Sequence, residues 1–139
     1  FSATPGAGAA GGLGFGLMAF AEATIESGFD VFAKATGLKT KIGEADFVVT
    51  AEGAIDEQTL MGKGTGQIAV LCRRLGKPCI GLAGQLALGQ AKGDPGEALF
   101  WRLAAMVPDL AGKTEAMADA ATHLERLAKR EGELSTFGT

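Results

Sequence analysis

The chain has 139 residues, of which 47% are hydrophobic, and a formal net charge of −3. This length is enough for one domain with its own core, and the mild acidity argues against a broad nucleic-acid surface, which needs clustered lysine and arginine. Residues 1–21 carry no charge, but their six glycines and Pro5 make them too weakly apolar to span a membrane. They also lack the basic start of a signal peptide. We therefore expect a soluble protein with a small-molecule site and without nucleic-acid or membrane partners.

The sequence contains two cysteines, Cys72 and Cys79, and a single histidine, His123. Six residues separate the cysteines, which matches neither a redox pair nor a zinc-ligand pattern. Both lie among apolar neighbours, so we predict buried, reduced thiols in a cytoplasmic protein. His123 lies among polar residues in a helical pattern, which predicts a surface position.

The first forty residues predict two helices. The stretch "TPGAGAAGGLGFGLMAFAEA" begins as a loop and turns into a helix. Gly8, Gly12 and Gly16 recur every fourth residue, and each helical glycine costs about 1 kcal/mol relative to alanine. We expect another backbone or a ligand to pack against this stripe. Residues 27–38 predict a second short helix that Gly37 closes.

The remaining residues alternate between strand and helix. Short apolar runs predict buried strands at 45–50, 77–84 and 98–107, although the apolar residues of 98–107 also suit a helix. Helical spacing predicts helices at 66–76 and 114–130, the last with Thr114 as its N-cap. Residues 51–64 are expected to form a loop. This order predicts an α/β fold with a mainly parallel sheet flanked by helices over residues 1–131, followed by a flexible tail, 132–139.

The stretch "TAEGAIDEQTLMGKG" (50–64) places polar side chains after the first strand, where ligands bind in open α/β sheets. Glu52 and Asp56 are candidate magnesium ligands, and either is a candidate base for an attacking hydroxyl. Lys63, between Gly62 and Gly64, is a candidate phosphate contact. The alternative is a solvated loop without function.

The stretch "GAGAAGG" matches G-x-G-x-x-G through Gly6, Gly8 and Gly11 and opens a helix. A dinucleotide fingerprint also needs a strand directly before it, and "FSATP" does not provide one. We interpret the segment as a candidate anion-binding loop. The stretch "MGKGTGQ" is not a Walker loop, because Glu57 stands where that motif needs glycine.

Three stretches together resemble the glycerate kinases of the bacterial type. They are "PGAGAAGGLGFGL", "ADFVVTAEGAIDEQTLMGKG" and "KPCIGLAG", and the helix "EAMADAATHLERLAK" also suits the family. The resemblance implies a Rossmann-like or flavodoxin-like sheet within a larger two-domain α/β kinase. It also implies transfer of the γ-phosphoryl group of ATP to D-glycerate with the help of Mg²⁺.

Residue by residue, the resemblance assigns a catalytic set and a binding set. Glu52, Asp56 and Lys63 are the expected catalytic residues, with Glu52 and Asp56 as ligands of Mg²⁺. The expected substrate or phosphate contacts come from the glycine-rich segment and the acidic loop: Gly6, Gly8, Gly11, Gly12, Gln58, Thr59, Gly62 and Gly64.

The chain departs from the family at several places. Ala51 stands where the family has glycine, and its Cβ near the expected turn of the loop is expected to shift Glu52 slightly. Thr65 and Gln67 stand where the family carries proline and glycine. A "DSFKG"-like motif typical of the family's start is absent. We therefore expect the C-terminal portion of a kinase that needs an N-terminal part of the same protein, and a homo-oligomer is possible. A nucleotide-binding module without catalysis and a truncated interaction fragment are the alternatives.

Overall fold

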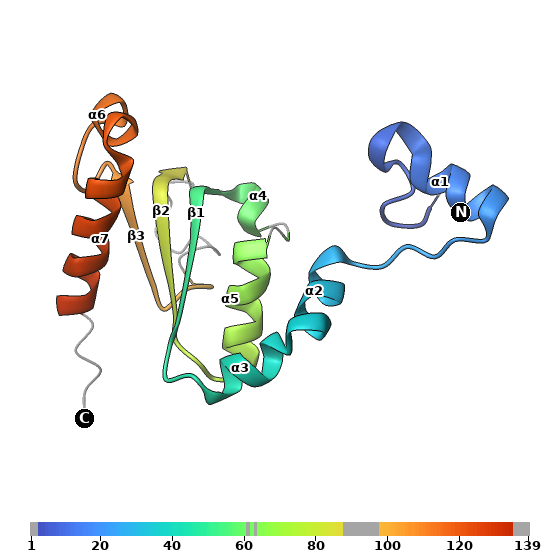
Figure 1. Ribbon diagram of the computed structural model, residues 1–139, viewed down its shortest axis with the longest axis horizontal. Helices are drawn as coiled ribbons and strands as arrows, with labels where there is room; N and C mark the ends of the chain where they lie inside the picture. Colours follow the sequence, from blue (N-terminus) through green and yellow to red (C-terminus); the bar gives the residue numbers. More distant parts are fainter. Residues whose placement is uncertain (1–2, 61, 63, 88–97, 135–139) are drawn as a thin grey trace. The chain divides into compact units, whose positions relative to one another are not determined.

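A computed structural model describes residues 3–60, 62, 64–87 and 98–134. The chain divides into two compact units, Phe1–Leu38 and Lys39–Thr139, and each is described by itself. Figure 1 labels the helices and strands. In chain order they are α1 (Ala9–Ala21), α2 (Gly28–Thr36), α3 (Leu38–Glu44), β1 (Val48–Asp56), α4 (Glu57–Leu60), α5 (Gly64–Arg74), β2 (Cys79–Ala87), β3 (Arg102–Val107), α6 (Lys113–Ala118) and α7 (Ala120–Leu134).

The first unit begins with the glycine-rich segment, which runs into α1. Ala10, Gly11 and Gly12 have positive φ angles of 51°, 68° and 91°, a conformation that glycine adopts at little cost. The regular part of the helix therefore begins at Leu13. The predicted change from loop to helix is confirmed, and so is α2, which Ser27 caps and Gly37 ends.

The predicted glycine stripe does not form a packing surface within this unit. A Cβ at Gly8, Gly12 or Gly16 would meet nothing within 4 Å, and the left-handed residues interrupt the helical spacing. The close approach is instead at Gly14, where a Cβ would lie 2.7 Å from the carbonyl oxygen of Gly6. Gly14 thus allows the Gly6 turn to lie against the helix.

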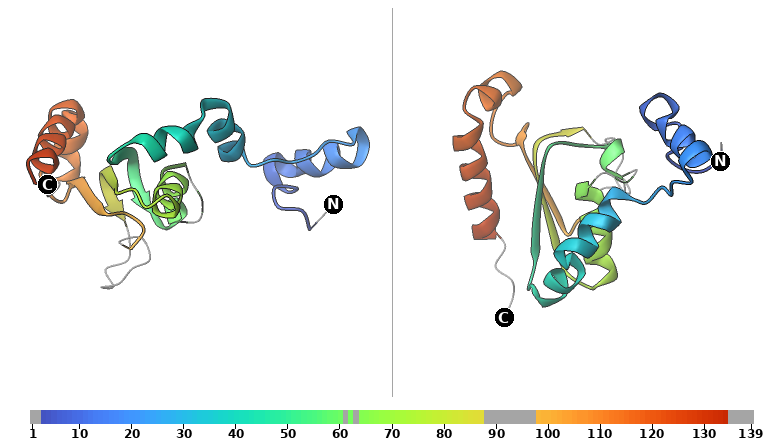
Figure 2. Two further views of the ribbon diagram at one scale, coloured as in Figure 1. Left: turned by 90° about the horizontal axis from the view of Figure 1, so that it is seen from below. Right: turned by 45° about the vertical axis from the view of Figure 1, so that its right-hand side comes forward.

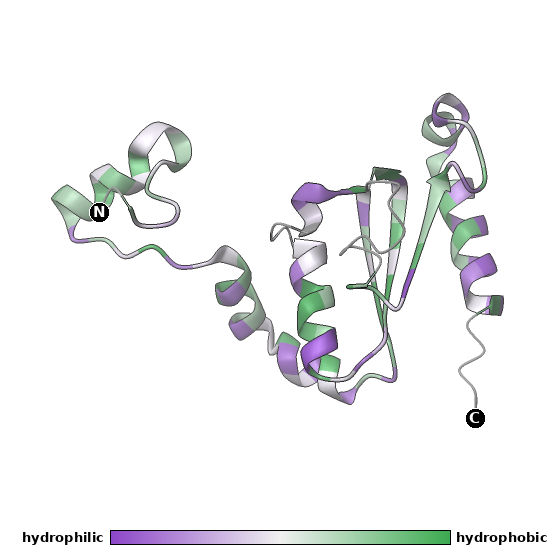
Figure 3. Ribbon diagram, turned by 180° about the vertical axis from the view of Figure 1, so that it is seen from behind, coloured by the Kyte–Doolittle hydropathy of each residue, from purple (hydrophilic) through white to green (hydrophobic). Residues whose placement is uncertain are grey.

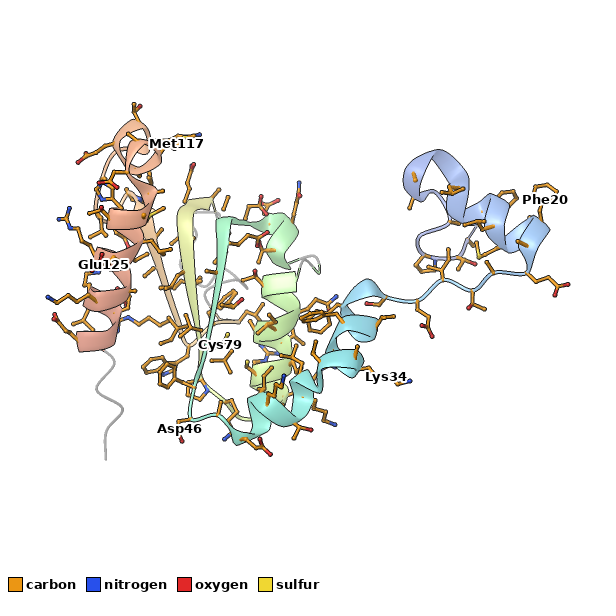
Figure 4. All side chains as sticks on the ribbon, viewed as in Figure 1. Phe20, Lys34, Asp46, Cys79, Met117 and Glu125 are labelled. Carbon is orange, nitrogen blue, oxygen red and sulfur yellow. The ribbon has the colours of Figure 1, made fainter. Side chains whose placement is uncertain are left out.

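Helix α1 is apolar around much of its surface, as Figure 3 shows by hydropathy. Leu13, Phe15 and Leu17 are exposed, and the side chain of Phe20, labelled in Figure 4, is 90% exposed. Among the residues that the structure describes, no helix combines the length and hydropathy needed to cross a bilayer.

The second unit is built on a three-stranded parallel sheet of order β1-β2-β3. The first five residues of the central strand β2 are all buried, as expected for a strand with layers on both faces. Helix α5 contacts β1 and β2, and α7 contacts β2 and β3. Figures 1 and 2 show these two helices on opposite faces of the sheet, so this unit has three layers.

Two hydrophobic clusters hold the second unit together. Ile80, Leu82 and Ala104 pack with Leu127 of α7 in one cluster. Ile55, Ala83 and Ala105 form the other. The α/β class and the parallel sheet flanked by helices are confirmed.

Charged residues attach α7 to β3. Glu131, 4% exposed, pairs with Arg102 of β3 and accepts a hydrogen bond from Nε of Arg130 at 2.9 Å. Arg130 also pairs with Asp109 at 3.0 Å, and Asp109 accepts the N–H of Ala105. The buried carboxylate therefore has two cationic partners, which offset its desolvation.

Several predicted boundaries are wrong. Strand β1 continues through residues 51–56, and α4 follows it, so the segment predicted as a loop is largely regular. Helix α3 was not predicted. The predicted helix 114–130 breaks at Asp119 (φ −138°, ψ 58°), and its N-cap is Gly112 rather than Thr114. Helix α7 reaches Leu134, so the predicted boundary at 131/132 falls inside a helix, and residues 135–139 lie outside the described residues.

His123 is buried, 4% exposed, and the prediction of a surface position is wrong. It lies on the inner face of α7, with Nε2 4.0 Å from a carboxylate oxygen of Glu115 in α6. The break at Asp119 allows α6 and α7 to pack on one another, which covers the ring. The prediction assumed one continuous helix, in which Glu115 and His123 would not come close to one another.

The two cysteines are free thiols, buried as predicted. Burial raises the pKa of the Cys79 thiol to about 12, and the adjacent Cys72 adds to the effect. Burial also raises the pKa of Cys72. Because the thiolate is the reactive form, both groups are expected to be inert in the folded protein.

We expect a thiol reagent at about pH 8 to label neither cysteine in the native protein and both in urea. The unfolded thiol ionises near 9.0 and the folded Cys79 near 12. The protonated Cys79 thiol therefore contributes fully to the free energy of unfolding below pH 9.0, and this contribution is lost as the pH rises toward about 12. Urea unfolding across this window measures the loss, and Cys79→Ala should make it smaller. Rapid labelling of the native protein would contradict the buried placement.

Candidate functional site

Strand β1 carries the acidic residues to the carboxyl edge of the sheet. Glu52 and Asp56 are half-buried there, and α4 begins directly after Asp56. In Figure 1 this end of β1 meets α4 beside the start of α5. Ligands bind at this edge in open α/β sheets.

Asp56 caps the short helix that follows it. Its Oδ1 accepts the N–H of Gln58 at 2.9 Å and of Thr59 at 3.2 Å. Aspartate is among the preferred N-cap residues because its carboxylate satisfies these free donors. Within the described part of the chain, Oδ2 of Asp56 has no hydrogen bond, so it is the oxygen left for chemistry.

Thr59 joins the two carboxylates. Its hydroxyl donates to Oε2 of Glu52 at 3.1 Å and accepts the N–H of Asp56 at 3.3 Å. The residue is fully buried. Thr59 thus lies behind Glu52 and Asp56 and is not accessible to a ligand, although the sequence suggested it as a substrate or phosphate contact.

Helix α5 packs closely against this arrangement. A Cβ at Gly66 would lie 1.9 Å from the carbonyl oxygen of Thr59. Gln67 donates to the carbonyl of Gly62 at 3.2 Å, and Gly62 has a φ of 113°. These two contacts connect α4 and the Gly62 turn to α5. Gln67, which the sequence marked only as a departure from the family, therefore supports the turn.

Replacing Thr59 with valine should lower the free energy of unfolding by about 1–3 kcal/mol. The change keeps the volume but removes the hydroxyl that donates to Oε2 of Glu52 and accepts the N–H of Asp56. Thr59→Ser keeps the hydroxyl and should restore most of the loss. Urea unfolding of the two variants measures the difference. Equal stability of the valine and serine variants would show that the hydroxyl does not stabilise the site.

The structure brings together only part of the predicted set. Glu52, Asp56 and Thr59 form one hydrogen-bonded group, and Gln58 lies exposed beside it. Gly64 begins α5 and Gly62 precedes it, and Lys63 lies outside the described residues. The remaining predicted residues belong to the first unit: Gly6, Gly8, Gly11 and Gly12.

Ala51 differs from the glycine of the family and directly precedes Glu52, but it does not disrupt the strand. It lies within β1 opposite Leu82 and its side chain is exposed. The expected displacement of Glu52 assumed a turn at this position. A strand accommodates a Cβ without strain, so that reason no longer applies.

The donor set suits a hard divalent cation. Magnesium is usually held by one or two carboxylates and completes its shell with water and phosphate oxygens. Glu52 and Asp56 supply two carboxylates joined through one residue. No cluster of three or more metal-ligating side chains occurs in the described residues. The site therefore fits magnesium shared with phosphate rather than a closed protein cage.

Known proteins are similar to this chain in sequence and in fold. Residues 1–135 match the glycerate kinase family. A glycerate kinase from Halalkalibacterium halodurans is 38% identical over 96% of this chain and 34% of its own length. A glycerate 2-kinase from Escherichia coli K12 is 44% identical over 59% of this chain and 22% of its own.

The fold of this chain is also similar to that of a solved structure. The crystal structure of a proposed glycerate kinase 2 from Salmonella typhimurium LT2 superposes with a TM-score of 0.56 at 28% identity, over 93% of this chain and 33% of that one. The chain thus spans about a third of the length of the first relatives it matches.

Proposed function

The chain belongs to the glycerate kinase family, and from this premise we propose that its complete gene product transfers the γ-phosphoryl group of ATP to D-glycerate. The observation that supports the proposal most directly is the hydrogen-bonded group of Glu52, Thr59 and Asp56 at the carboxyl edge of the sheet. Because the chain spans about a third of its relatives, we assign the activity to the complete gene product.

Asp56 is the proposed general base. Its Oδ1 is held by two backbone N–H groups, so the carboxylate is fixed while Oδ2 is available. Oδ2 accepts the proton of the glycerate hydroxyl as its oxygen bonds to the γ-phosphorus. The bond from that phosphorus to the bridging oxygen breaks, and ADP leaves. A fixed base costs little reorganisation at the moment of reaction.

Glu52 is the proposed ligand of Mg²⁺. Asp56 is proposed as the base instead of a second ligand, because its Oδ1 is held by two N–H groups and its Oδ2 takes the proton. Thr59 holds Glu52 through Oε2, and we propose that Thr59 positions this carboxylate without touching the substrate. When bound, Mg²⁺ offsets the charge of the phosphate oxygens. Lys63 and Gln58 are proposed as contacts to phosphate or glycerate.

The glycine-rich segment is proposed as a second phosphate contact. Gly6, Gly11 and Gly12 have positive φ angles, so backbone N–H groups can face an anion where side chains would interfere. Gly8 belongs to the same turn. The contact is proposed for the complete gene product.

The test is glycerate-dependent ADP formation by the complete gene product with ATP and Mg²⁺. D-lactate offers only the 2-hydroxyl group, and 3-hydroxypropionate offers only the 3-hydroxyl group. The proposal predicts ADP formation with D-glycerate that stops when EDTA is added. Activity with only one analogue identifies the accepting hydroxyl. A folded protein that binds ATP but forms no ADP with D-glycerate would contradict the proposal.

A further inference from the structure

A second feature of the carboxyl edge lies on the face of the sheet that α6 and α7 cover. It is a pocket of about 270 Å³, here called the methionine pocket. Its walls come from all three strands and from both helices: Gly53, Gly84, Met106, Ala116, Met117 and Ala120. Figure 4 labels Met117 on α6, at the end of the sheet where the strands finish.

Other hollows of this unit lie elsewhere. One of about 390 Å³ surrounds the amino end of β2, at Lys77 and Pro78. Another of about 460 Å³ runs along the sheet beside Val49 and Ala128. Ligands in open α/β sheets bind beyond the carboxyl ends of the strands, and of these hollows the methionine pocket is the one at that edge.

The chemistry of the lining selects one class of ligand. Most lining residues are apolar, and Gln85 and Lys113 are the polar ones. A small hydroxy acid needs several donors around its carboxylate, which this lining does not offer. A flat heteroaromatic ring suits it better, because ring faces are apolar and thioether sulfur contacts aromatic rings favourably.

The floor of the pocket is bare backbone. A Cβ at Gly84 would lie 2.6 Å from the carbonyl oxygen of Gly53 and 3.5 Å from Cε of Met106. The sheet itself therefore excludes a side chain at Gly84, and Gly53 has none. A Cβ at Gly53 would meet nothing within 4 Å, so the open part of the floor, where a planar ring can lie, is at Gly53.

Two polar residues suit the ends of a nucleotide. Gln85 carries a carboxamide, a group that pairs with the N6 and N7 edge of adenine. Lys113, exposed at the start of α6, carries a positive charge that suits phosphate. Glu52, the proposed magnesium ligand, directly precedes Gly53 in β1, so the base and the phosphates would meet at one edge of the sheet.

We propose that the methionine pocket binds the adenine ring of ATP, an inference that rests on the proposed function. The volume supports a single base, since sites for drug-sized ligands occupy about 300–1,000 Å³. The ribose and triphosphate lie outside the pocket and pass across the carboxyl edge toward Glu52 and Asp56.

Ala120→Phe tests the proposal by filling the pocket from an exposed position on α7. In the complete gene product, the Kd values for adenosine and ATP should rise at least tenfold, while that for tripolyphosphate stays unchanged. Ala121→Phe is the matched control, because Ala121 is exposed on the same helix and does not line the pocket. Unchanged binding of adenosine and ATP by folded Ala120→Phe would overturn the proposal.

Photolabelling of the unaltered protein with 2-azido-ATP gives a result that does not depend on how a variant folds. The label should appear on peptides that contain Met106 or Met117, and unmodified adenosine should prevent it. Labelling confined to other peptides would overturn the inference even if the protein phosphorylates glycerate. Labelling at the pocket without glycerate phosphorylation would support the inference and contradict the proposed function.

Discussion

Replacing Asp56 with asparagine in the complete gene product is expected to lower kcat for glycerate phosphorylation by about 10²–10⁴-fold. Asparagine caps a helix about as well as aspartate does. The bonds from Oδ1 to the N–H groups of Gln58 and Thr59 can therefore persist. What the change removes is the negative charge and the proton acceptor at the other oxygen. The thermal midpoint should hardly move.

Glu57→Gln is the matched control for this experiment. Glu57 is the next residue, is exposed, and has no part in the group formed by Glu52, Thr59 and Asp56. Removing its charge should change kcat by less than about threefold, since an exposed charge interacts weakly in water. Similar losses in both variants would mean that general electrostatics, rather than a base at Asp56, determines the rate.

Replacing Gly66 with alanine should be the most destabilising single change at the site. The new Cβ would be placed 1.9 Å from the carbonyl oxygen of Thr59 and 2.9 Å from its carbonyl carbon. Backbone atoms cannot turn aside as a side chain can, so α4 and α5 would have to separate. We expect a loss of more than about 4 kcal/mol, or no folded protein at all.

Gly64→Ala is the control for Gly66→Ala. Gly64 begins the same helix, is exposed, and a Cβ there would meet nothing within 4 Å. The free energy of unfolding of the Gly64→Ala variant should differ from that of the unaltered protein by less than about 1 kcal/mol. The thermal midpoints of the two variants provide the comparison. If Gly66→Ala melts within a few degrees of Gly64→Ala, then α4 and α5 do not pack as described.

The sequence was enough to predict the order of the main elements. The apolar runs before Glu52 and around Ile80 predicted two of the strands, because buried parallel strands read as continuous hydrophobic stretches. Their ends were less well predicted. Strand β1 passes through Glu52 and Asp56 because it pairs with β2 up to Ala87, and such pairing between distant residues leaves no mark in a local pattern.

The same reason explains why part of the site was missed. Glu52 and Asp56 could be selected from their charge and their place after a strand. The role of Thr59 depends on contacts with residues three and seven positions earlier, and that of Gly66 on its distance from Thr59. His123 is buried because the chain breaks at Asp119, and the polar neighbours of this residue gave no sign of that.

Phosphoryl transfer to glycerate can be followed directly in a ³¹P NMR time course of the complete gene product with ATP, Mg²⁺ and D-glycerate. It distinguishes transfer to glycerate from hydrolysis by water, which ADP formation alone does not. We expect a growing phosphomonoester signal of phosphoglycerate, equal in amount to the ADP formed and absent in the Asp56→Asn variant. A folded protein that releases only inorganic phosphate, or leaves ATP intact, would contradict the proposed function.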